Sequence, residues 1–107
     1  MNTLQWDKEF ALEQTAGDGE LLDELVALFQ ESFATDLERL KRATADNDPA
    51  AMAAAAHSIK GSAASLGIEG IRSLALAVEK AGLEGSVKGA QEKIRGLEEL
   101  LPAVHHL

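Results

Sequence analysis

The sequence predicts an all-α protein, an antiparallel up-down four-helix bundle with a short extra helix near the N-terminus. Aromatic residues make up only 4% of its 107 residues, and the chain contains only two prolines. This composition favours helices over strands. Apolar residues recur every three or four positions in several stretches, as on one face of a helix. The short joints between these stretches imply antiparallel neighbours. The length suits one domain with one modest core, so we expect residues 1–107 to form a single domain with its core at about residues 8–101.

The two ends of the chain are expected to fray. Residues 1–6 precede the first helical pattern, with Trp6 as a candidate anchor. Asp7 has the side chain needed to cap a short helix over about residues 8–14. Phe10 is expected to face inward from that helix.

A long helix of about 25 residues is predicted after a break marked by glycines. Gly17 and Gly19 interrupt the first pattern, and Asp18 is a suitable cap for the helix that follows. Its apolar side chains alternate in steps of three and four. They are Leu22, Leu25, Val26, Phe29, Phe33, Leu37 and Leu40.

The next helix has clear start and stop signals. Asp48 is predicted to cap it, and Pro49 to take the first helical position, where a missing N–H does no harm. The helix should run to Leu66, because Gly67 can adopt the left-handed conformation that ends helices.

Two further helices complete the predicted bundle. The first spans about residues 69–81 and should end at Gly82 and Gly85. Ser86 can cap the second, and Pro102 should end or kink it near its C-terminus. The predicted inward positions are Ile71, Leu74, Val78 and Ala81 in the first, and Val87, Ala90, Ile94, Leu97, Leu101 and Val104 in the second.

Charge and composition argue against several classes of function. The formal net charge of −8 disfavours nucleic-acid binding, which needs a basic face. Without cysteine there is neither a disulfide framework nor a cysteine-based metal site. No apolar run approaches the length of a membrane span, so no membrane insertion is expected, and the N-terminus does not resemble a signal peptide. No ATP-binding loop or kinase signature is present.

The helix from Pro49 to Leu66 should present a lone imidazole on a face of small residues. At about 100° of rotation per residue, an apolar stripe lies on one side and His57 points the opposite way. Lys60 lies about 60° from His57, and Gly61 lies about 40° away on the other flank. The stripe comprises Met52, Ala55, Ile59 and Leu66, and the small residues around His57 are Ala50, Ala53, Ala54 and Ala64.

An exposed solitary histidine is most often an ordinary surface residue, so any other role needs specific support. A metal site needs a second ligand about one turn away, and the neighbours of His57 are alanine, glycine and lysine, so no metal is expected. The apolar stripe argues against a buried core histidine. A catalytic triad is not supported, because Ser58 and Ser62 lie about 100–140° from His57 and no Gly-x-Ser-x-Gly elbow exists.

The remaining role for His57 is that of a nucleophile toward an electrophile that a partner brings. An exposed imidazole nitrogen can accept a phosphoryl group. Lys60, one turn on, can neutralise part of the added charge of about −1.5 to −2. Gly61 leaves no Cβ over the approach path, and a mid-helix glycine costs about 1 kcal/mol relative to alanine, so its presence suggests a steric need.

These residues resemble the histidine phosphotransfer (HPt) domains of bacterial phosphorelays, whose pattern is His-x-x-Lys-Gly-Ser/Ala followed by a Leu-Gly helix end. The matching residues are His57, Lys60, Gly61, Ser62, Leu66 and Gly67. The segment of residues 16–22, followed by the long amphipathic helix, also resembles the family, so the resemblance covers about residues 8–101. It implies that His57 is phosphorylated on the nitrogen farther from the backbone, that Lys60 assists the phosphoryl group, and that Gly61 permits close docking.

Some members of this family carry a glutamine or another polar residue on the next helix, beside the histidine. The matching position here is Glu79, which departs from that pattern, so no role is carried over to it. The expected docking face around His57 consists of Gly61, Ala53, Ala54 and Ala64.

The resemblance implies a phosphocarrier rather than an enzyme. Its partners would be response-regulator receiver domains, with a hybrid sensor histidine kinase as a further candidate. His57 would accept the phosphoryl group from a receiver aspartate and pass it to another receiver. We expect no cofactor on this chain, with Mg²⁺ on the receiver instead. We also expect a monomer, either cytoplasmic or the cytosolic domain of a larger sensor kinase.

Two alternatives stay open at this point. The first is the phosphoacceptor domain of a chemotaxis-type histidine kinase, which shares a His-Ser-Ile-Lys-Gly-like motif but receives its phosphoryl group from a kinase domain. The segment of residues 16–22 favours the relay class over this one. The second alternative is a non-catalytic helical adaptor, in which His57 would be dispensable.

Overall fold

A computed structural model describes residues 2–107, and Met1 lies outside the described residues. The helices are α1 (Lys8–Gln14), α2 (Gly19–Ala45), α3 (Pro49–Leu66), α4 (Glu69–Leu83), the short 3₁₀ helix η1 (Lys88–Ala90), α5 (Gln91–Glu99) and α6 (Leu101–His105). No helix within this described part of the chain is both long enough and apolar enough to cross a membrane.

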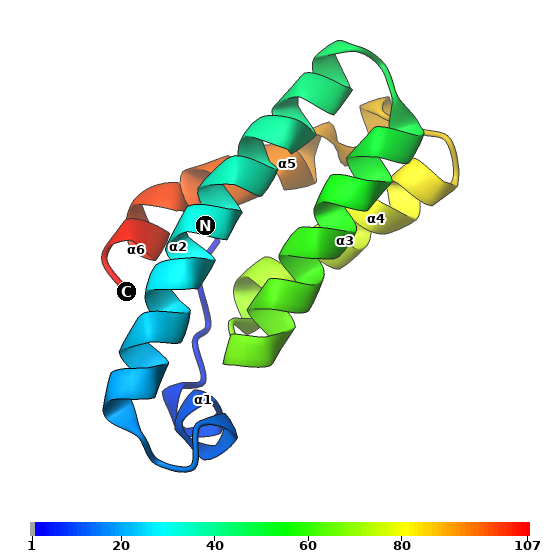
Figure 1. Cartoon of the computed structure of the whole chain (residues 1–107). Coiled ribbons are helices and arrows are strands. Elements are labelled where there is room, and N and C mark those ends of the chain that lie inside the picture. The colour runs from blue at the N-terminus through cyan, green and yellow to red at the C-terminus, as the bar shows by residue number, and fades with distance from the viewer. Residues whose placement is uncertain (1) are drawn as a thin grey trace.

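The bundle consists of α2, α3, α4 and the α5–α6 pair (Figure 1). α2 and α3 are antiparallel neighbours, α3 packs along α4, and α5 contacts both α4 and α2. α1 lies across one end of the bundle, beside the start of α2 (Figure 1). The predicted fold class, an all-α bundle with a short extra N-terminal helix, is therefore confirmed.

The helix starts follow from the predicted caps. The carboxylates of Asp7, Asp18 and Asp48 accept hydrogen bonds at 3.0–3.1 Å from backbone N–H groups in the first turns of α1, α2 and α3. Such caps satisfy N–H groups that have no partner within the helix. Gly67 ends α3 with a φ of 70°, in the left-handed region that favours glycine.

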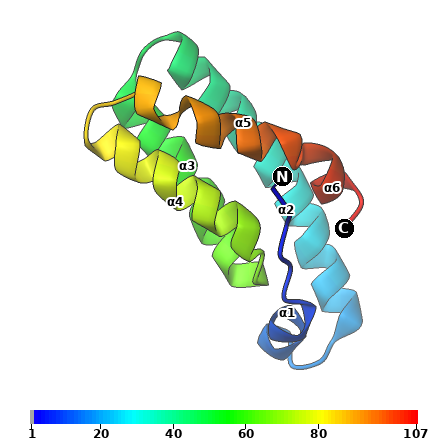
Figure 2. The same ribbon diagram turned by 180° about the vertical axis from the view of Figure 1, so that it is seen from behind.

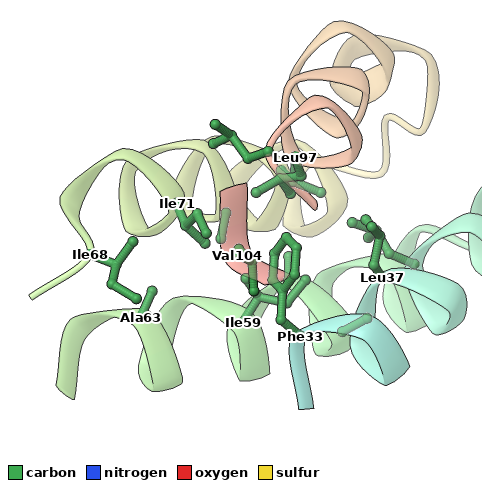
Figure 3. Close-up of a cluster of buried hydrophobic side chains, with 14 of the residues drawn as sticks. Phe33, Leu37, Ile59, Ala63, Ile68, Ile71, Leu97 and Val104 are labelled. Carbon is green, nitrogen blue, oxygen red and sulfur yellow. The ribbon is translucent and has the colours of Figure 1, made fainter. Parts of the chain in front are cut away.

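The core runs along the middle of the bundle and receives side chains from each of its helices. Figure 3 shows the labelled side chains converging from α2, α3, α4, α5 and α6. Among them are Phe33, Leu37, Ile59, Ala63, Ile71, Leu97 and Val104, all of them buried. Burying one large apolar side chain contributes about 1.5–3 kcal/mol, so this cluster fixes which side of α3 faces inward.

The segment before α1 corrects the expectation of a frayed N-terminus. Residues 2–6 run back along the bundle from α1 (Figure 2). The Gly70 N–H donates to the Leu4 carbonyl at 2.8 Å, and the Trp6 indole N–H donates to the Leu66 carbonyl at 2.9 Å. Trp6 therefore anchors the N-terminal segment, as the sequence suggested, and its indole N–H is the hydrogen-bond partner of a backbone carbonyl at the end of α3. These bonds arise between segments distant in sequence, which no local pattern reveals.

Phe10 corrects a second expectation. Its side chain is 36% exposed rather than directed into the core. The buried residue of α1 is Ala11. A Cβ added at Gly67 would lie 2.9 Å from the Phe10 ring, so this ring covers the end of α3 and stays partly open to solvent.

α4 continues past its predicted end, through Gly82 to Leu83. Gly82 is buried, and a Cβ there would lie 2.7 Å from the Pro49 carbonyl oxygen and 2.8 Å from the Ala53 Cβ. Gly82 therefore lets α4 approach the first turns of α3 and does not stop the helix. The left-handed residue after the helix is Gly85, with a φ of 80°.

The last predicted helix is divided into three pieces. The Ser86 hydroxyl accepts a hydrogen bond from the Gly89 N–H at 3.0 Å, and η1 leads directly into α5. The chain then restarts as α6, with Pro102 in its first turn. Proline has no backbone N–H to donate to the preceding turn, which accounts for the interruption of the helix at Leu100. The sequence predicted that Pro102 would end or kink the helix at about this place.

A pair of glycine substitutions tests the role of Gly82. Gly82→Ala should lower the free energy of unfolding by about 1–3 kcal/mol, because the added methyl overpacks the α3–α4 contact. Gly61→Ala should instead raise it by about 0.5–1 kcal/mol, since a Cβ at Gly61 meets nothing within 4 Å. Urea unfolding followed by circular dichroism measures both changes. Equal effects of the two substitutions would contradict this explanation.

Candidate functional site

His57 lies on the outer face of α3, near the middle of that helix. Its side chain is 69% exposed, whereas Ala56 and Ile59 on the same helix are buried. Since the core fixes the inward side of α3, the imidazole points toward solvent. A partner can therefore reach it without rearranging the bundle.

One nitrogen of the imidazole is held by a carboxylate from the neighbouring helix. His57 Nδ1 lies 2.6 Å from Oε2 of Glu79, on α4. An ionised carboxylate can only accept hydrogen bonds, so Nδ1 carries the proton in this pair. In the neutral ring the lone pair then lies on Nε2, the nitrogen farther from the backbone.

The same carboxylate binds Lys60. The Lys60 ammonium donates to Glu79 Oε1 at 2.6 Å, so the two oxygens of Glu79 bind two residues of α3 that lie about one turn apart. The hydrogen bond from Lys60 holds the pKa of Glu79 below its ordinary value; burial opposes this shift and the hydrogen bond from His57 adds to it. Glu79 is therefore ionised at neutral pH, as the tautomer of His57 requires.

One residue of the predicted docking face, Ala53, does not lie on the exposed surface around His57. Gly61, Ala54 and Ala64 are exposed around His57. Ala53 is buried, with 6% exposure, and it contacts Gly82 in α4. The helical rotation of about 100° per residue predicted Ala53 on the same face as His57. In the structure, α4 covers the side of α3 on which Ala53 lies. Ala53 is therefore a packing residue, and it does not belong to the docking face.

A buried acid on α2 fixes α3 at the level of His57. The Asp36 side chain accepts a hydrogen bond from the Ser58 hydroxyl at 2.7 Å and one from Arg39 at 3.1 Å. Asp36 is 5% exposed, and a buried carboxylate is tolerated only when such partners are present. Because Ser58 follows His57 in the chain, these bonds restrict the rotation of α3 and hold the imidazole outward.

The contacts of Glu79 and Asp36 were missed from the sequence. A signal for Asp36 does exist, because it lies within the apolar spacing of α2, between Phe33 and Leu37, where an acid must find a buried partner. The family resemblance placed Glu79 beside His57 but gave it no role, so its bonds to His57 and Lys60 were not predicted.

The residues around His57 do not form an evident metal site. Across residues 2–107, no three histidine, cysteine, aspartate or glutamate side chains gather as metal ligands would. The chemistry available at His57 is that of an exposed nucleophilic nitrogen, with a cation one turn away and a carboxylate behind the ring.

The tautomer of His57 gives a direct test of this geometry. In the unmodified protein, ¹⁵N-detected NMR of the imidazole should show the proton on Nδ1. Glu79→Ala should shift the population toward the Nε2–H form, because no acceptor remains. Glu79→Gln should retain much of the original tautomer through its amide oxygen. Glu79→Ala should cost about 1–2 kcal/mol of stability, because the Glu79 side chain is only 13% exposed and its loss leaves Lys60 without this partner; Glu79→Gln should cost less. An unchanged tautomer in the alanine variant would contradict the assignment.

Comparison with known proteins identifies the family and the fold of this chain. The sequence model of the Hpt domain matches residues 24–106. Among solved structures, the chain is similar to the HPt domain from the Hpt sensor hybrid histidine kinase from Shewanella, with a TM-score of 0.77 and 20% sequence identity over 95% of this chain and 92% of that chain. That likeness shows a common fold. No curated protein matches the sequence. Since the family match covers most of the chain, the protein belongs to the Hpt domain family, and its function is histidine phosphotransfer in a phosphorelay.

Proposed function

We propose that His57 is the residue that carries the phosphoryl group and that Nε2 is the nitrogen to which it is attached. The observation that supports this most strongly is the bond from His57 Nδ1 to Glu79. It leaves a lone pair on the outward nitrogen of an exposed ring. The chain's other two histidines are His105, the last residue of α6, and His106 after it; α6 contacts α2 and α5 rather than α3.

The proposed step is an in-line transfer from an aspartyl phosphate of a receiver domain. The Nε2 lone pair forms a bond to phosphorus while the bond from phosphorus to the aspartate oxygen breaks. Its electron pair leaves with the aspartate carboxylate, and no proton has to move. The product is a phosphorylated ring that still carries the Nδ1 proton and hence a positive charge, which the Glu79 carboxylate stabilises. The reverse step passes the group to another receiver.

Lys60 supports the phosphoryl group in this proposal. Its ammonium lies one turn from His57 and is already oriented by Glu79. A cation placed where phosphate charge arrives lowers the barrier for transfer in either direction. The remaining charge would be neutralised by Mg²⁺ bound to the receiver, as metal ions do in phosphoryl transfer generally. Gly61 keeps the approach to the ring open, because it has no Cβ.

Receiver domains are the partners of HPt domains in phosphorelays. For this chain we infer at least two of them, a donor and an acceptor, with a hybrid sensor kinase as one source. The structural neighbour from Shewanella is described as part of such a hybrid kinase. We also propose that the protein acts as a monomer in the cytoplasm.

Transfer from a panel of phosphorylated receiver domains tests the proposal. Label should appear on the protein and be stable to base and labile to acid, as expected for phosphohistidine. His57→Gln should abolish it, whereas the double substitution of His105 and His106 by glutamine should leave it unchanged. Label in the His57 variant would refute the assignment. Label only from a chemotaxis kinase core with ATP would favour the chemotaxis alternative, and label from neither source would favour an adaptor.

Lys60→Ala should slow transfer by on the order of tenfold. Removing a hydrogen-bond donor from an enclosed active site typically slows a reaction by about 10²–10³. The expected effect is smaller here because solvent and salt screen the charge of Lys60. Lys80→Ala is a matched control, since Lys80 is an exposed cation next to Glu79 in sequence. Quench-flow transfer kinetics measure both variants, and thermal unfolding checks that each remains folded. Loss of the unfolding transition in the Lys60 variant would mark this lysine as structural.

A further inference from the structure

Asp36 is a buried acid that takes no direct part in the proposed phosphoryl transfer. It lies on the inward face of α2, between the buried Phe33 and Leu37, and its side chain is only 7% exposed. Arg39 donates to its Oδ1 at 3.1 Å, and the Ser58 hydroxyl donates to its Oδ2 at 2.7 Å. A buried ion pair is often no more stabilising than apolar side chains of similar volume. Stability alone therefore does not account for a carboxylate at this position.

Two hydrogen bonds hold the same turn of α3 from opposite helices. His57 and Ser58 are consecutive, so their side chains diverge by about 100° around the helix. The Ser58 hydroxyl reaches Asp36 on α2, whereas His57 Nδ1 lies 2.6 Å from Glu79 on α4. α3 packs against both of these helices (Figure 1). Any rotation of α3 about its axis therefore changes both bonds at once.

Apolar packing constrains the rotation of α3 only weakly. Met52, Ile59 and Leu66 are its large buried side chains, and its other buried positions are all alanine. Alanine has no atoms beyond Cβ that could interlock with the grooves of a neighbouring helix, and apolar burial itself has no preferred direction. Across residues 2–107, the bond from Ser58 to Asp36 is the only side-chain hydrogen bond that joins α2 to α3. This bond is therefore the directional contact that α3 makes with α2.

A small rotation of α3 is enough to disturb the site. The tip of a side chain on a helix lies about 5–6 Å from the helix axis, so a rotation of about 10° moves it by roughly 1 Å. Such a shift would stretch the 2.6 Å contact between His57 Nδ1 and Glu79 beyond hydrogen-bond range. Misplacement of a reacting group by about 1 Å can slow a reaction by about 10²-fold.

We propose that Asp36 is a positioning residue for phosphoryl transfer and that it acts by holding Ser58. This bond sets the rotation of α3 at which His57 Nδ1 meets Glu79. Arg39 balances the charge of Asp36 and does not contribute to the rotation, because it belongs to the same helix as Asp36. The consequence for the transfer rate rests on the proposed role of His57, whereas the consequence for the tautomer of its ring does not.

Two substitutions remove the bond, one from each helix. Asp36→Leu replaces the carboxylate by an apolar side chain of similar size, and Ser58→Ala removes the hydroxyl. Neither residue is bonded to the imidazole, yet each substitution should move the ¹⁵N NMR signals of His57 toward the Nε2–H form. Each should also slow transfer from a saturating phosphorylated receiver by about tenfold, within the range expected for a misplaced reacting group.

Two further variants serve as controls. Asp36→Asn keeps an oxygen that can accept from Ser58, so it should retain the tautomer and transfer at nearly the unmodified rate. Glu38→Leu removes the same charge from α2, where the ion-pair partner of Glu38 is Lys41 of the same helix. This variant should change neither the tautomer nor the rate.

A double-substitution cycle tests whether Asp36 acts through Ser58. In the Ser58→Ala protein, Asp36→Leu should slow transfer no further, because substitutions that remove one shared bond are not additive. Thermal unfolding should show that Asp36→Leu is as stable as the unmodified protein or more stable, which separates positioning from loss of the fold. If Asp36→Leu does not fold, Ser58→Ala alone provides the test. Additive effects on the transfer rate would refute the route through Ser58.

Phosphoramidate, a small phosphoryl donor that needs no docking surface, separates this inference from the proposed function. If neither phosphoramidate nor any receiver labels the unmodified protein, the proposed role of His57 fails, and the NMR measurement still decides the role of Asp36. An unchanged tautomer in both Asp36→Leu and Ser58→Ala would overturn the positioning role. An Asp36→Asn protein that behaves like Asp36→Leu would also overturn it, because the charge of Asp36 rather than its bond to Ser58 would then be what matters.

Discussion

The arrangement of the site depends on one ionised carboxylate held between two helices. Glu79 of α4 binds His57 through one oxygen and Lys60 through the other, both at 2.6 Å. The first bond determines which nitrogen of the ring is nucleophilic, and the second holds a cation beside the position that a phosphoryl group would take. Because both partners belong to α3, a single side chain from α4 organises the reactive nitrogen and its supporting charge together.

This contact requires α3 and α4 to lie close together and in a fixed register, which the small residues between them make possible. Gly82 and Ala53 bring the end of α4 against the first turns of α3. At the other end of α4, a Cβ on Gly70 would overlap the Thr3 and Leu4 backbone of the N-terminal segment. Interiors are packed too tightly to absorb an added methyl without a shift. These contacts far from the imidazole therefore determine where Glu79 lies relative to His57.

Most of the fold could be predicted because its signals are local. The caps Asp18 and Asp48, the left-handed Gly67 and the three-to-four spacing of α2 each depend on a few neighbouring residues. The contacts that the sequence did not predict lie between segments distant in sequence. They are the hydrogen bonds of Trp6 and Leu4, the packing of Gly82 against α3, and the bonds of Glu79 to His57 and Lys60. The misassignment of Ala53 has the same cause, because helical rotation gives the angle of a residue but not which neighbouring helix covers it.

The balance of charge at the site suits a group that must leave as readily as it arrives. With His57 neutral, the positive charge of Lys60 and the negative charge of Glu79 cancel, so the site exerts little net attraction on a phosphate dianion. If His57 is the phosphorylated residue, as proposed, phosphorylation of Nε2 would create a positive ring only while the group is attached, and Glu79 is placed to stabilise it. A more basic site would bind the phosphoryl group more tightly and slow the return transfer, since stabilising a bound state equally raises the barrier to leaving it. In the proposed mechanism the carboxylate behind the ring would therefore limit how strongly the group is held, as well as orienting the nitrogen that receives it.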